Sequence, residues 1–253
     1  MLHRFDRTTF LQACHDYHTD YEPPFGDEPV YQLFVLNPQD LSPGPLAARA
    51  VTYLDLWKGY NFRYEKEGLR RAREYLPEFF ENSRIRRSIR TLRSRHLESL
   101  KPSDFSHVHE LMSTLLDELA FDPGKGRPRQ GAATPAGKLL HFLAPHAVVM
   151  WDSDIIRTRA YGIGDSADDY VGYQRFCQRV LWLLSGSGRD NALGDIARRH
   201  SVRCHLSYIE PLPKLLDEMA YYKSGRIAKR AARAVAQDMG VSPDELWDRL
   251  RER

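Results

Sequence analysis

The spacing of apolar positions along the chain predicts a mainly helical protein. Between residues 105 and 119 apolar side chains recur every three or four positions, which places them on one broad face of a helix. Pro77 and Pro145 are expected to end two of the other helices. The same periodicity, together with cap residues, predicts further helices at 65–76, 84–97, 134–143, 154–161, 167–184, 191–200, 212–222 and 226–239, and a short one after residue 242.

Candidate strands are few, at 30–36, 148–151 and 201–209, too few for a doubly wound sheet. A stretch rich in proline and glycine at 122–133 cannot be helical and separates two halves of the chain. We therefore expect two helical lobes, residues 1–121 and residues 122–253, with a cleft between them near the 122–160 segment.

Composition agrees with a globular protein in water. Of the 253 residues 42% are apolar and 28% are charged, and no apolar run approaches the roughly 18 residues that span a membrane. The three cysteines lie far apart without a C-x-x-C pair, which argues against a disulfide framework, a zinc ribbon and an iron–sulfur loop. We expect a cytoplasmic monomer with no membrane partner, no metal and no cofactor.

The distribution of charge indicates a polyanionic partner, and we expect that partner to be DNA. The net charge is only +3, but six arginines and no acid occur between residues 84 and 95. Burial of Ile85, Ile89 and Leu92 would turn three of these arginines outward together. The alternative is an ordinary solvated helix face. The residues expected to hold phosphates are Arg86, Arg90 and Arg93 on this helix and Lys125, Arg127 and Arg129 in the proline- and glycine-rich stretch at 122–133.

Several familiar motifs are absent from the sequence. Gly137 and Lys138 lack the remaining residues of a phosphate-binding P-loop, and no H-E-x-x-H, G-x-S-x-G or G-x-G-x-x-G occurs. His107 and His109 could begin a metal site, but residues two apart on a helix point in different directions.

The residues around Asp152 form the strongest chemical pattern. Asp152 follows an apolar run at 147–151 and is expected to begin a helix, where free backbone N–H groups and the helix dipole keep its carboxylate ionised. Partial desolvation by Trp151 would suit it to stabilise a developing cation or to deprotonate water. The alternative is a plain helix cap.

At these residues the chain resembles the helix-hairpin-helix DNA glycosylase superfamily, which includes endonuclease III and the 8-oxoguanine glycosylases. The family places an apolar run before an essential aspartate and an arginine five positions after it, as Asp152 and Arg157 stand here. The segment Leu139–Leu143 looks like the second helix of the family's hairpin. The resemblance covers about 30 residues of the chain.

The sequence departs from the family pattern in three places. Asp154 stands where the family usually has histidine, and residues 133–137 lack the Gly-x-Gly turn of the hairpin. Lys138 lies closer to the aspartate than the Schiff-base lysine of the bifunctional members does. These departures leave phosphate binding by the hairpin and lyase activity open.

The resemblance implies an all-α fold with a cleft, flipping of a base out of the duplex, and hydrolysis of its N-glycosidic bond. Asp152 would support the oxocarbenium-like sugar, and water, or alternatively Lys138, would attack it; the alternative for Lys138 is a surface lysine. Arg157 would join the DNA contacts. The base pocket is predicted to contain Trp57, Tyr60, Trp151 and His141.

Two further hypotheses remain open at this point. The chain could be a helical nucleic-acid-binding or defence-associated module without chemistry, in which Asp152 is only a cap. It could also be a metal-dependent nuclease that uses His107, His109 and nearby acids. For a glycosylase, the sequence leaves open both the base removed and the choice between repair and attack on phage DNA with modified bases.

Overall fold

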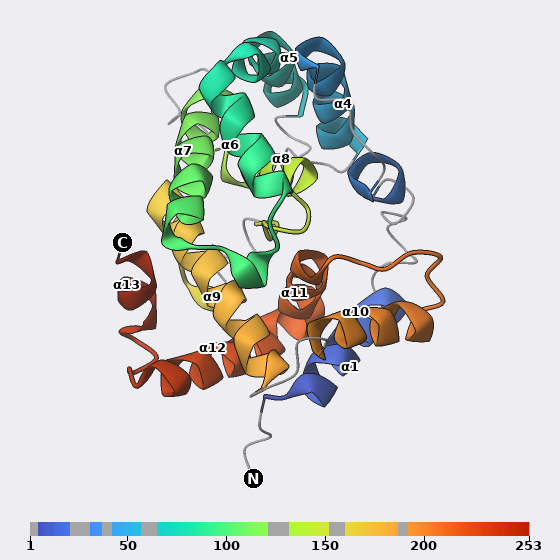
Figure 1. Cartoon of the computed structure of the whole chain (residues 1–253), viewed down its shortest axis with the longest axis vertical. Helices are drawn as coiled ribbons and strands as arrows, with labels where there is room; N and C mark the ends of the chain where they lie inside the picture. The colour runs from blue at the N-terminus through green and yellow to red at the C-terminus, as the bar shows by residue number, and fades with distance from the viewer. Residues whose placement is uncertain are drawn as a thin grey trace.

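The computed structural model describes residues 5–20, 31–36, 42–56, 65–120, 132–151, 160–186 and 192–252, and these are helical with no strand among them (Figure 1). The predicted mainly α fold is confirmed. The elements are α1 (Arg7–Asp20), η1 (Gln32–Leu36), α4 (Pro43–Leu56), α5 (Glu65–Glu81), α6 (Ser83–Arg93), η2 (Leu97–Ser99), α7 (Pro102–Leu119), α8 (Ala133–Leu143), α9 (Ala167–Ser185), α10 (Ala192–Arg203), α11 (Leu212–Tyr221), η4 (Tyr222–Gly225), α12 (Arg226–Met239) and α13 (Leu246–Arg251).

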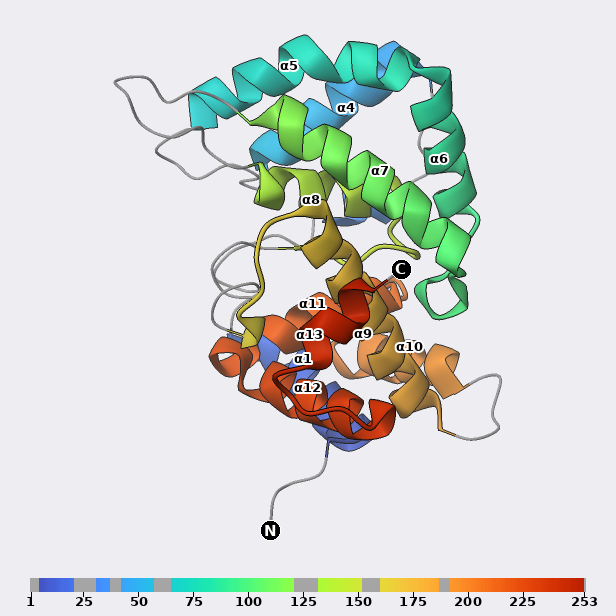
Figure 2. The same cartoon turned by 90° about the vertical axis from the view of Figure 1, so that its left-hand side faces the viewer.

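The helices form two groups joined by one long helix. Helices α4 to α8 gather at one end of the molecule, α1 and α10 to α13 gather at the other, and α9 packs against members of both (Figure 2). Helix α1 contacts α10, α11 and α12, so the first helix of the chain belongs with the last ones. The predicted division at residues 121 and 122 therefore does not describe the position of α1. A single cluster of buried apolar side chains runs through both groups.

The predicted amphipathic faces are confirmed in α6 and α7. Ile85, Ile89 and Leu92 are buried on one side of α6, whose first turn is capped by the Asn82 side chain, which accepts hydrogen bonds from two backbone N–H groups. The apolar positions expected between 105 and 119 lie on the buried face of α7. Among the described residues, no helix combines the length and apolar character that crossing a bilayer requires.

Several sequence expectations about boundaries and strands are wrong. Residues 32–36 form a π-helical turn, 148–151 have no regular secondary structure, and α10 occupies the first part of 201–209. Helix α5 continues through Pro77 to Glu81, because its buried apolar face continues to Phe79 and Phe80 beyond the proline. Ala132 takes the N-cap position of α8 that was expected for Thr134. The helix expected at 154–161 lies almost entirely outside the described residues.

Side chains of α9 form hydrogen bonds with the buried backbone of residues 148–151. The Val149 N–H donates to Gln174 Oε1 at 2.8 Å, and the Val149 carbonyl accepts from Gln174 Nε2 at 3.0 Å and from the Tyr170 hydroxyl at 2.9 Å. Trp151 stacks on Tyr170 with ring centroids 4.8 Å apart. The segment is thus fixed by a helix rather than by a neighbouring strand.

Helix α8 approaches Trp151 closely at Gly137. A Cβ atom added to Gly137 would lie 2.8 Å from Trp151 Cβ and 3.1 Å from the Trp151 backbone nitrogen. Neither atom lies at the end of a flexible side chain, so the glycine is required by the closeness of the two segments.

We expect Gly137→Ala to destabilise the protein by about 1–3 kcal/mol, because the new methyl group forces α8 and the Trp151 segment apart. The measurement is the free energy of unfolding in urea. Gly44→Ala is the matched control, since a Cβ at this helical glycine meets nothing within 4 Å, and it should be neutral or stabilising by about 0.4–1 kcal/mol. Equal stability of the two variants would contradict the close approach.

Candidate functional site

Many of the residues predicted from sequence to act on DNA lie outside the described residues. These are Asp152, Arg157, Lys125, Arg127, Arg129, Trp57 and Tyr60. The predictions made for them stay predictions.

The chain immediately before Asp152 is held firmly in the core. Trp151 has no exposed surface, stacks on Tyr170 and packs against the backbone of α8 at Gly137. Trp151 was predicted to line a base pocket, and the structure instead makes it an anchor between α8 and α9. Its burial fixes the point from which the Asp152 segment begins.

Lys138 is buried beside this anchor. It follows Gly137 directly on α8, and only 9% of its surface is exposed. All residues of α8 except Thr134 are buried, so this helix runs through the interior. The interpretation of Lys138 as an ordinary surface lysine is therefore wrong. Its position next to Gly137 on α8 places it in the same part of the fold as Trp151.

His141, the other residue of α8 predicted for the base pocket, is a hydrogen-bonded residue of the core. It has no exposed surface, its Nδ1 donates to the Val148 carbonyl at 2.6 Å, and its Nε2 accepts from the Tyr31 hydroxyl at 2.9 Å. Burial lowers the pKa of His141 to about 3, with smaller contributions in the same direction from Lys214 and His146. With both nitrogens occupied, a neutral His141 positions the chain at Val148 and does not form the wall of an open pocket.

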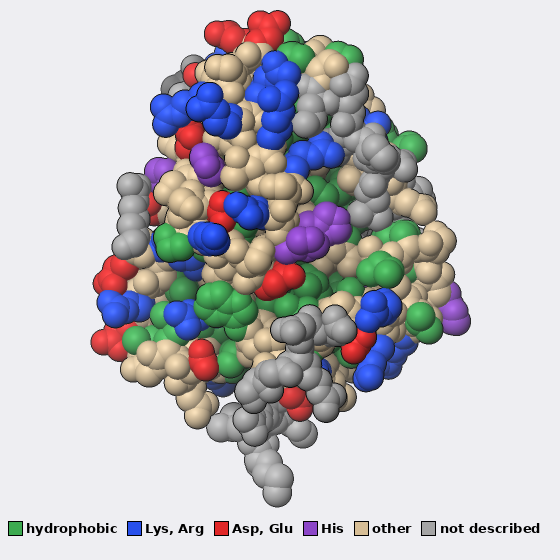
Figure 3. All heavy atoms as spheres, viewed as in Figure 1, with side chains coloured by type: hydrophobic (Ala, Val, Ile, Leu, Met, Phe, Trp, Pro, Cys, Tyr) green, Lys and Arg blue, Asp and Glu red, His purple; other side chains and the backbone are tan. Residues whose placement is uncertain are grey.

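The arginine row on α6 is present but unevenly exposed. Arg90 is exposed, whereas Arg86 and Arg93 are partly buried, and burial lowers the pKa of Arg93. Figure 3 shows Lys and Arg side chains on the face of the molecule that carries α6. Of the three arginines expected to face phosphates together, Arg90 has the greatest freedom to do so.

A groove of about 670 Å³ lies between α6, α7, α9 and α13. It contains His107 and His109, but these side chains have separate partners: His107 Nδ1 lies 3.0 Å from Ser88 Oγ, and His109 Nε2 lies 3.2 Å from Asp168 Oδ1. Neither histidine belongs to a group of three or more converging metal ligands within the described part of the chain. The metal-dependent nuclease hypothesis gains no support from this geometry.

A second polar cluster lies buried where α1, α10 and α11 meet. His18 comes from the last turn of α1, His200 from α10, Glu218 from α11, and Glu210 from the chain just before α11. Each offers one donor atom to a set whose members lie within 4.8 Å of one another. His200, Glu210 and Glu218 have at most 1% of their side-chain surface exposed, and His18 has 9%.

The cluster has strong internal electrostatics. Burial would lower the pKa of His18, but hydrogen bonds to Glu210 and Glu218 raise it to about 10. Burial would also raise the pKa of Glu210, yet His18 and His200 hold it well below its usual range. The Lys214 ammonium lies 3.1 Å from Glu218 Oε1 and over the rings of Tyr17 and Tyr31.

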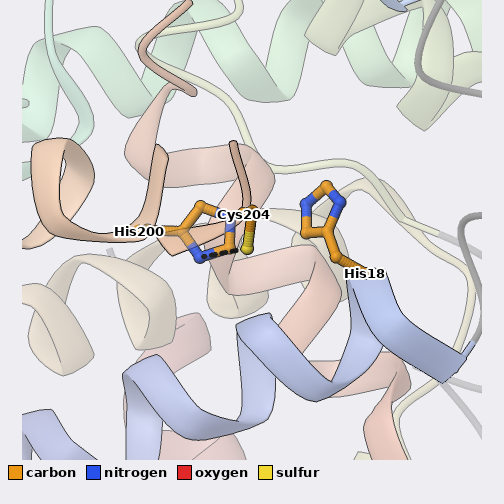
Figure 4. Close-up of side chains that lie close together, drawn as sticks. All are labelled: His18, His200 and Cys204. Atoms are coloured by element: carbon orange, nitrogen blue, oxygen red, sulfur yellow. Dashed lines mark hydrogen bonds between the residues drawn. The ribbon is translucent and has the colours of Figure 1, made fainter. Parts of the chain in front are cut away.

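Sequence reasoning missed this cluster because its members are far apart in the chain. A local signal was present: Glu218 lies in the apolar helix α11, between Leu215, Leu216, Met219 and Ala220. A second signal was the pair His200 and Cys204, spaced one helical turn apart. Figure 4 shows these two side chains on one side of the junction with His18 facing them from α1.

We expect the buried His141 to make the protein less stable in mild acid. An unfolded histidine titrates near 6.5 and the folded one near 3, so between these values the folded state binds fewer protons. The free energy of unfolding then decreases as pH falls through this window, by up to about 1.4 kcal/mol per pH unit. His141→Asn keeps a donor for the Val148 carbonyl and removes the titration, so its stability should depend less on pH between 6.5 and 4.5. The free energy of unfolding in urea is measured for both proteins at several pH values. If it changes with pH equally in the two proteins, the assignment is wrong.

No family model, no curated protein and no solved structure matches this chain. The resemblance to the helix-hairpin-helix glycosylases consequently rests on the residues around Asp152 and on the α8 segment. A function for the protein is inferred from those residues and from the contacts described above.

Proposed function

We propose that this protein is a DNA glycosylase that flips a damaged or modified base out of a duplex and hydrolyses its N-glycosidic bond. The observation that carries the proposal is the anchoring of Trp151 against Gly137. It holds Trp151, the residue that precedes Asp152 in the sequence, against α8, the helix on which Lys138 is buried. An acid that stabilises a cationic transition state needs such a rigid support, since misplacement by about 1 Å is costly to the rate.

In this proposal Asp152 is the catalytic residue. Its carboxylate supports the positive charge that develops on the sugar as the base departs, and water attacks the anomeric carbon. Lys138 is the alternative nucleophile, since it is buried on the helix that contacts Trp151. Attack by Lys138 would give lyase activity in addition to base release.

The same proposal assigns the grip on DNA to basic side chains. Arg90, supported by Arg86 and Arg93 on α6, neutralises backbone phosphates, and Arg157 and the 125–129 tract add further contacts. Trp57 and Tyr60 are the proposed pocket residues, because stacking on aromatic rings holds an extruded base. The enzyme would act as a cytoplasmic monomer, in base repair or in defence against phage DNA with modified bases.

A second candidate function is a helical DNA-binding module without chemistry. The exposed Arg90 on α6 favours it, because that contact requires nothing from Asp152. Binding and its salt dependence are common to both functions. Release of a free base belongs to the glycosylase alone.

We expect Asp152→Asn to bind lesion-bearing duplex DNA as the wild type does and to lose base release by at least about 100-fold, because the neutral amide cannot stabilise the sugar cation. The measurement is mass spectrometry of bases freed from DNAs with oxidised, alkylated, deaminated and phage-type modified nucleotides. Asp244→Asn, which changes an exposed aspartate far along the chain, is the control and should retain full activity. If Asp152→Asn releases bases as fast as the wild type, the proposed mechanism fails; if neither protein releases any, the binding-module function stands.

We expect Arg90→Ala to weaken DNA binding equally for different sequences and to reduce the slope of log K against log salt by about 1, because one phosphate contact is lost. Binding is measured by fluorescence anisotropy at several salt concentrations. Arg70→Ala removes another exposed arginine, one that pairs with Glu67 and Glu74 on α5, and should leave the slope unchanged. An unchanged slope for Arg90→Ala would remove α6 from the DNA interface.

A further inference from the structure

The cluster of His18, His200, Glu210 and Glu218 has the composition of a metal site. It contains two imidazole nitrogens and two carboxylates, ligands that Zn²⁺ accepts in proteins. The four residues come from α1, from α10, and from α11 and the chain just before it. Donors from elements so far apart in sequence converge only because these elements fold onto one another.

The contacts between the histidines and the carboxylates have lengths close to the edges of a metal-centred tetrahedron. His18 Nε2 lies 3.3 Å from Glu210 Oε2 and 3.1 Å from Glu218 Oε1, while His200 Nε2 lies 2.9 Å from Glu210 Oε2 and 3.7 Å from Glu218 Oε2. With metal–ligand bonds of about 2.0–2.1 Å, the edges of a tetrahedron are about 3.3–3.4 Å long. The four distances lie on both sides of this value, and the Glu218 carboxylate faces His18 with Oε1 and His200 with Oε2.

A second observation is independent of composition. Among the described residues, neither His200 Nε2 nor Glu218 Oε2 has a hydrogen-bond partner, although both side chains are fully buried. His200 Nε2 approaches Glu210 Oε2 closely, but the two do not meet in hydrogen-bond geometry. Buried polar atoms that lack a hydrogen bond are costly, even where an opposite charge lies close to them. A cation held between the two side chains would satisfy both atoms.

The neighbouring side chains orient the ligands as supporting residues do in metal sites. Cys204 Sγ lies 3.8 Å from His200 Nδ1, which leaves the Nε2 atom of this ring for a metal. The Tyr208 hydroxyl donates to Glu210 Oε1 at 3.4 Å, and Lys214 binds Glu218 Oε1 at 3.1 Å. Glu210 thus has Oε1 bound by Tyr208 and Oε2 turned toward both histidines, while Glu218 turns Oε1 toward Lys214 and His18 and Oε2 toward His200.

We propose that His18, His200, Glu210 and Glu218 bind one divalent transition-metal ion, Zn²⁺ by donor set and geometry, in a closed tetrahedral site. Four protein ligands and nearly complete burial are typical of a structural metal rather than a catalytic one with an open position. The ion ties α1 to α10 and α11, which lie at opposite ends of the chain. The role proposed for the ion is to support the fold.

The competing explanation is an ion-pair network that contains no metal. In that case a protonated His18 and Lys214 balance the charges of Glu210 and Glu218. The two explanations differ in a measurable property, because only the metal site retains a stoichiometric ion.

The first experiment uses the full wild-type chain. Elemental analysis after purification, and again after chelation and reconstitution with Zn²⁺, should give one ion per chain. Reconstitution with Co²⁺ should give the intense visible absorption of a tetrahedral site. Removal of the metal should lower the thermal midpoint by at least about 5 °C, and Zn²⁺ should restore it. A chain that retains no stoichiometric ion after reconstitution overturns the proposal.

Variants then identify the ligands. Glu218→Gln keeps the shape of the side chain but loses its charge, and it should weaken Zn²⁺ binding by more than the roughly 10–100-fold loss that follows removal of a supporting residue. His200→Ala should abolish stoichiometric binding. If His200→Ala does not fold, the visible spectrum of Co²⁺-loaded Glu218→Gln, compared with that of the wild type, decides the question.

Two matched controls separate ligands from neighbours. His15→Ala removes a histidine one turn earlier on α1, whose Nδ1 faces Cys204 Sγ at 3.6 Å, and Cys204→Ser removes the nearby thiol. Both variants should retain one Zn²⁺ per chain. Loss of the ion in Cys204→Ser, or retention at full affinity in Glu218→Gln, would show that the proposed ligand set is wrong.

Discussion

The burial of a non-helical segment is the constraint on which this fold depends. Residues 147–151 cross the interior of an all-α structure, so their peptide groups have no strand with which to pair. The side chains of Gln174 and Tyr170 on α9, and of His141 on α8, bind the backbone there instead. An unpaired peptide group in such a place would cost about 1–3 kcal/mol, so the position of α9 relative to α8 is determined largely by these bonds. Gln178, one turn further along α9, binds the carbonyls of Leu97 and Leu100 in the same way.

This arrangement has a consequence for the proposed chemistry. With the backbone of Val149 fixed and Trp151 stacked on Tyr170, the chain enters the Asp152 segment from a rigid support. Because residue 137 is a glycine, Trp151 can contact α8 directly. Lys138, the next residue on this helix, is buried. Rigid placement of charged groups costs little at the moment of reaction, which is why enzymes build catalytic residues on such supports. In this proposal, DNA binding is assigned to α6 and catalysis to the Asp152 segment, which are different elements.

The second buried polar region poses a different physical problem. Two carboxylates, two histidines and a lysine are removed from water at the junction of α1, α10 and α11. Ionised groups in the interior are tolerated only when they are paired or bind a metal. Either solution couples the beginning of the chain to its last third, and the proposed ion does so with the strongest interactions. The group of helices at this end would then be held by a polar centre as well as by apolar packing.

The sequence by itself determined the helical class, the main helices and the faces they bury, because the spacing of apolar residues is a local property. It correctly placed the buried face of α7 and the stripe of Ile85, Ile89 and Leu92 on α6. It misjudged Pro77 and Thr134, where packing outweighs the local preference. It left the exposure of Lys138 open and predicted a pocket role for His141, because both properties depend on what surrounds α8. The return of α1 to the last helices and the meeting of His18, His200, Glu210 and Glu218 were decided by the tertiary structure alone. Contacts between residues nearly 200 positions apart leave no periodic trace in one sequence, since they follow from how the helices pack and not from where residues stand along them.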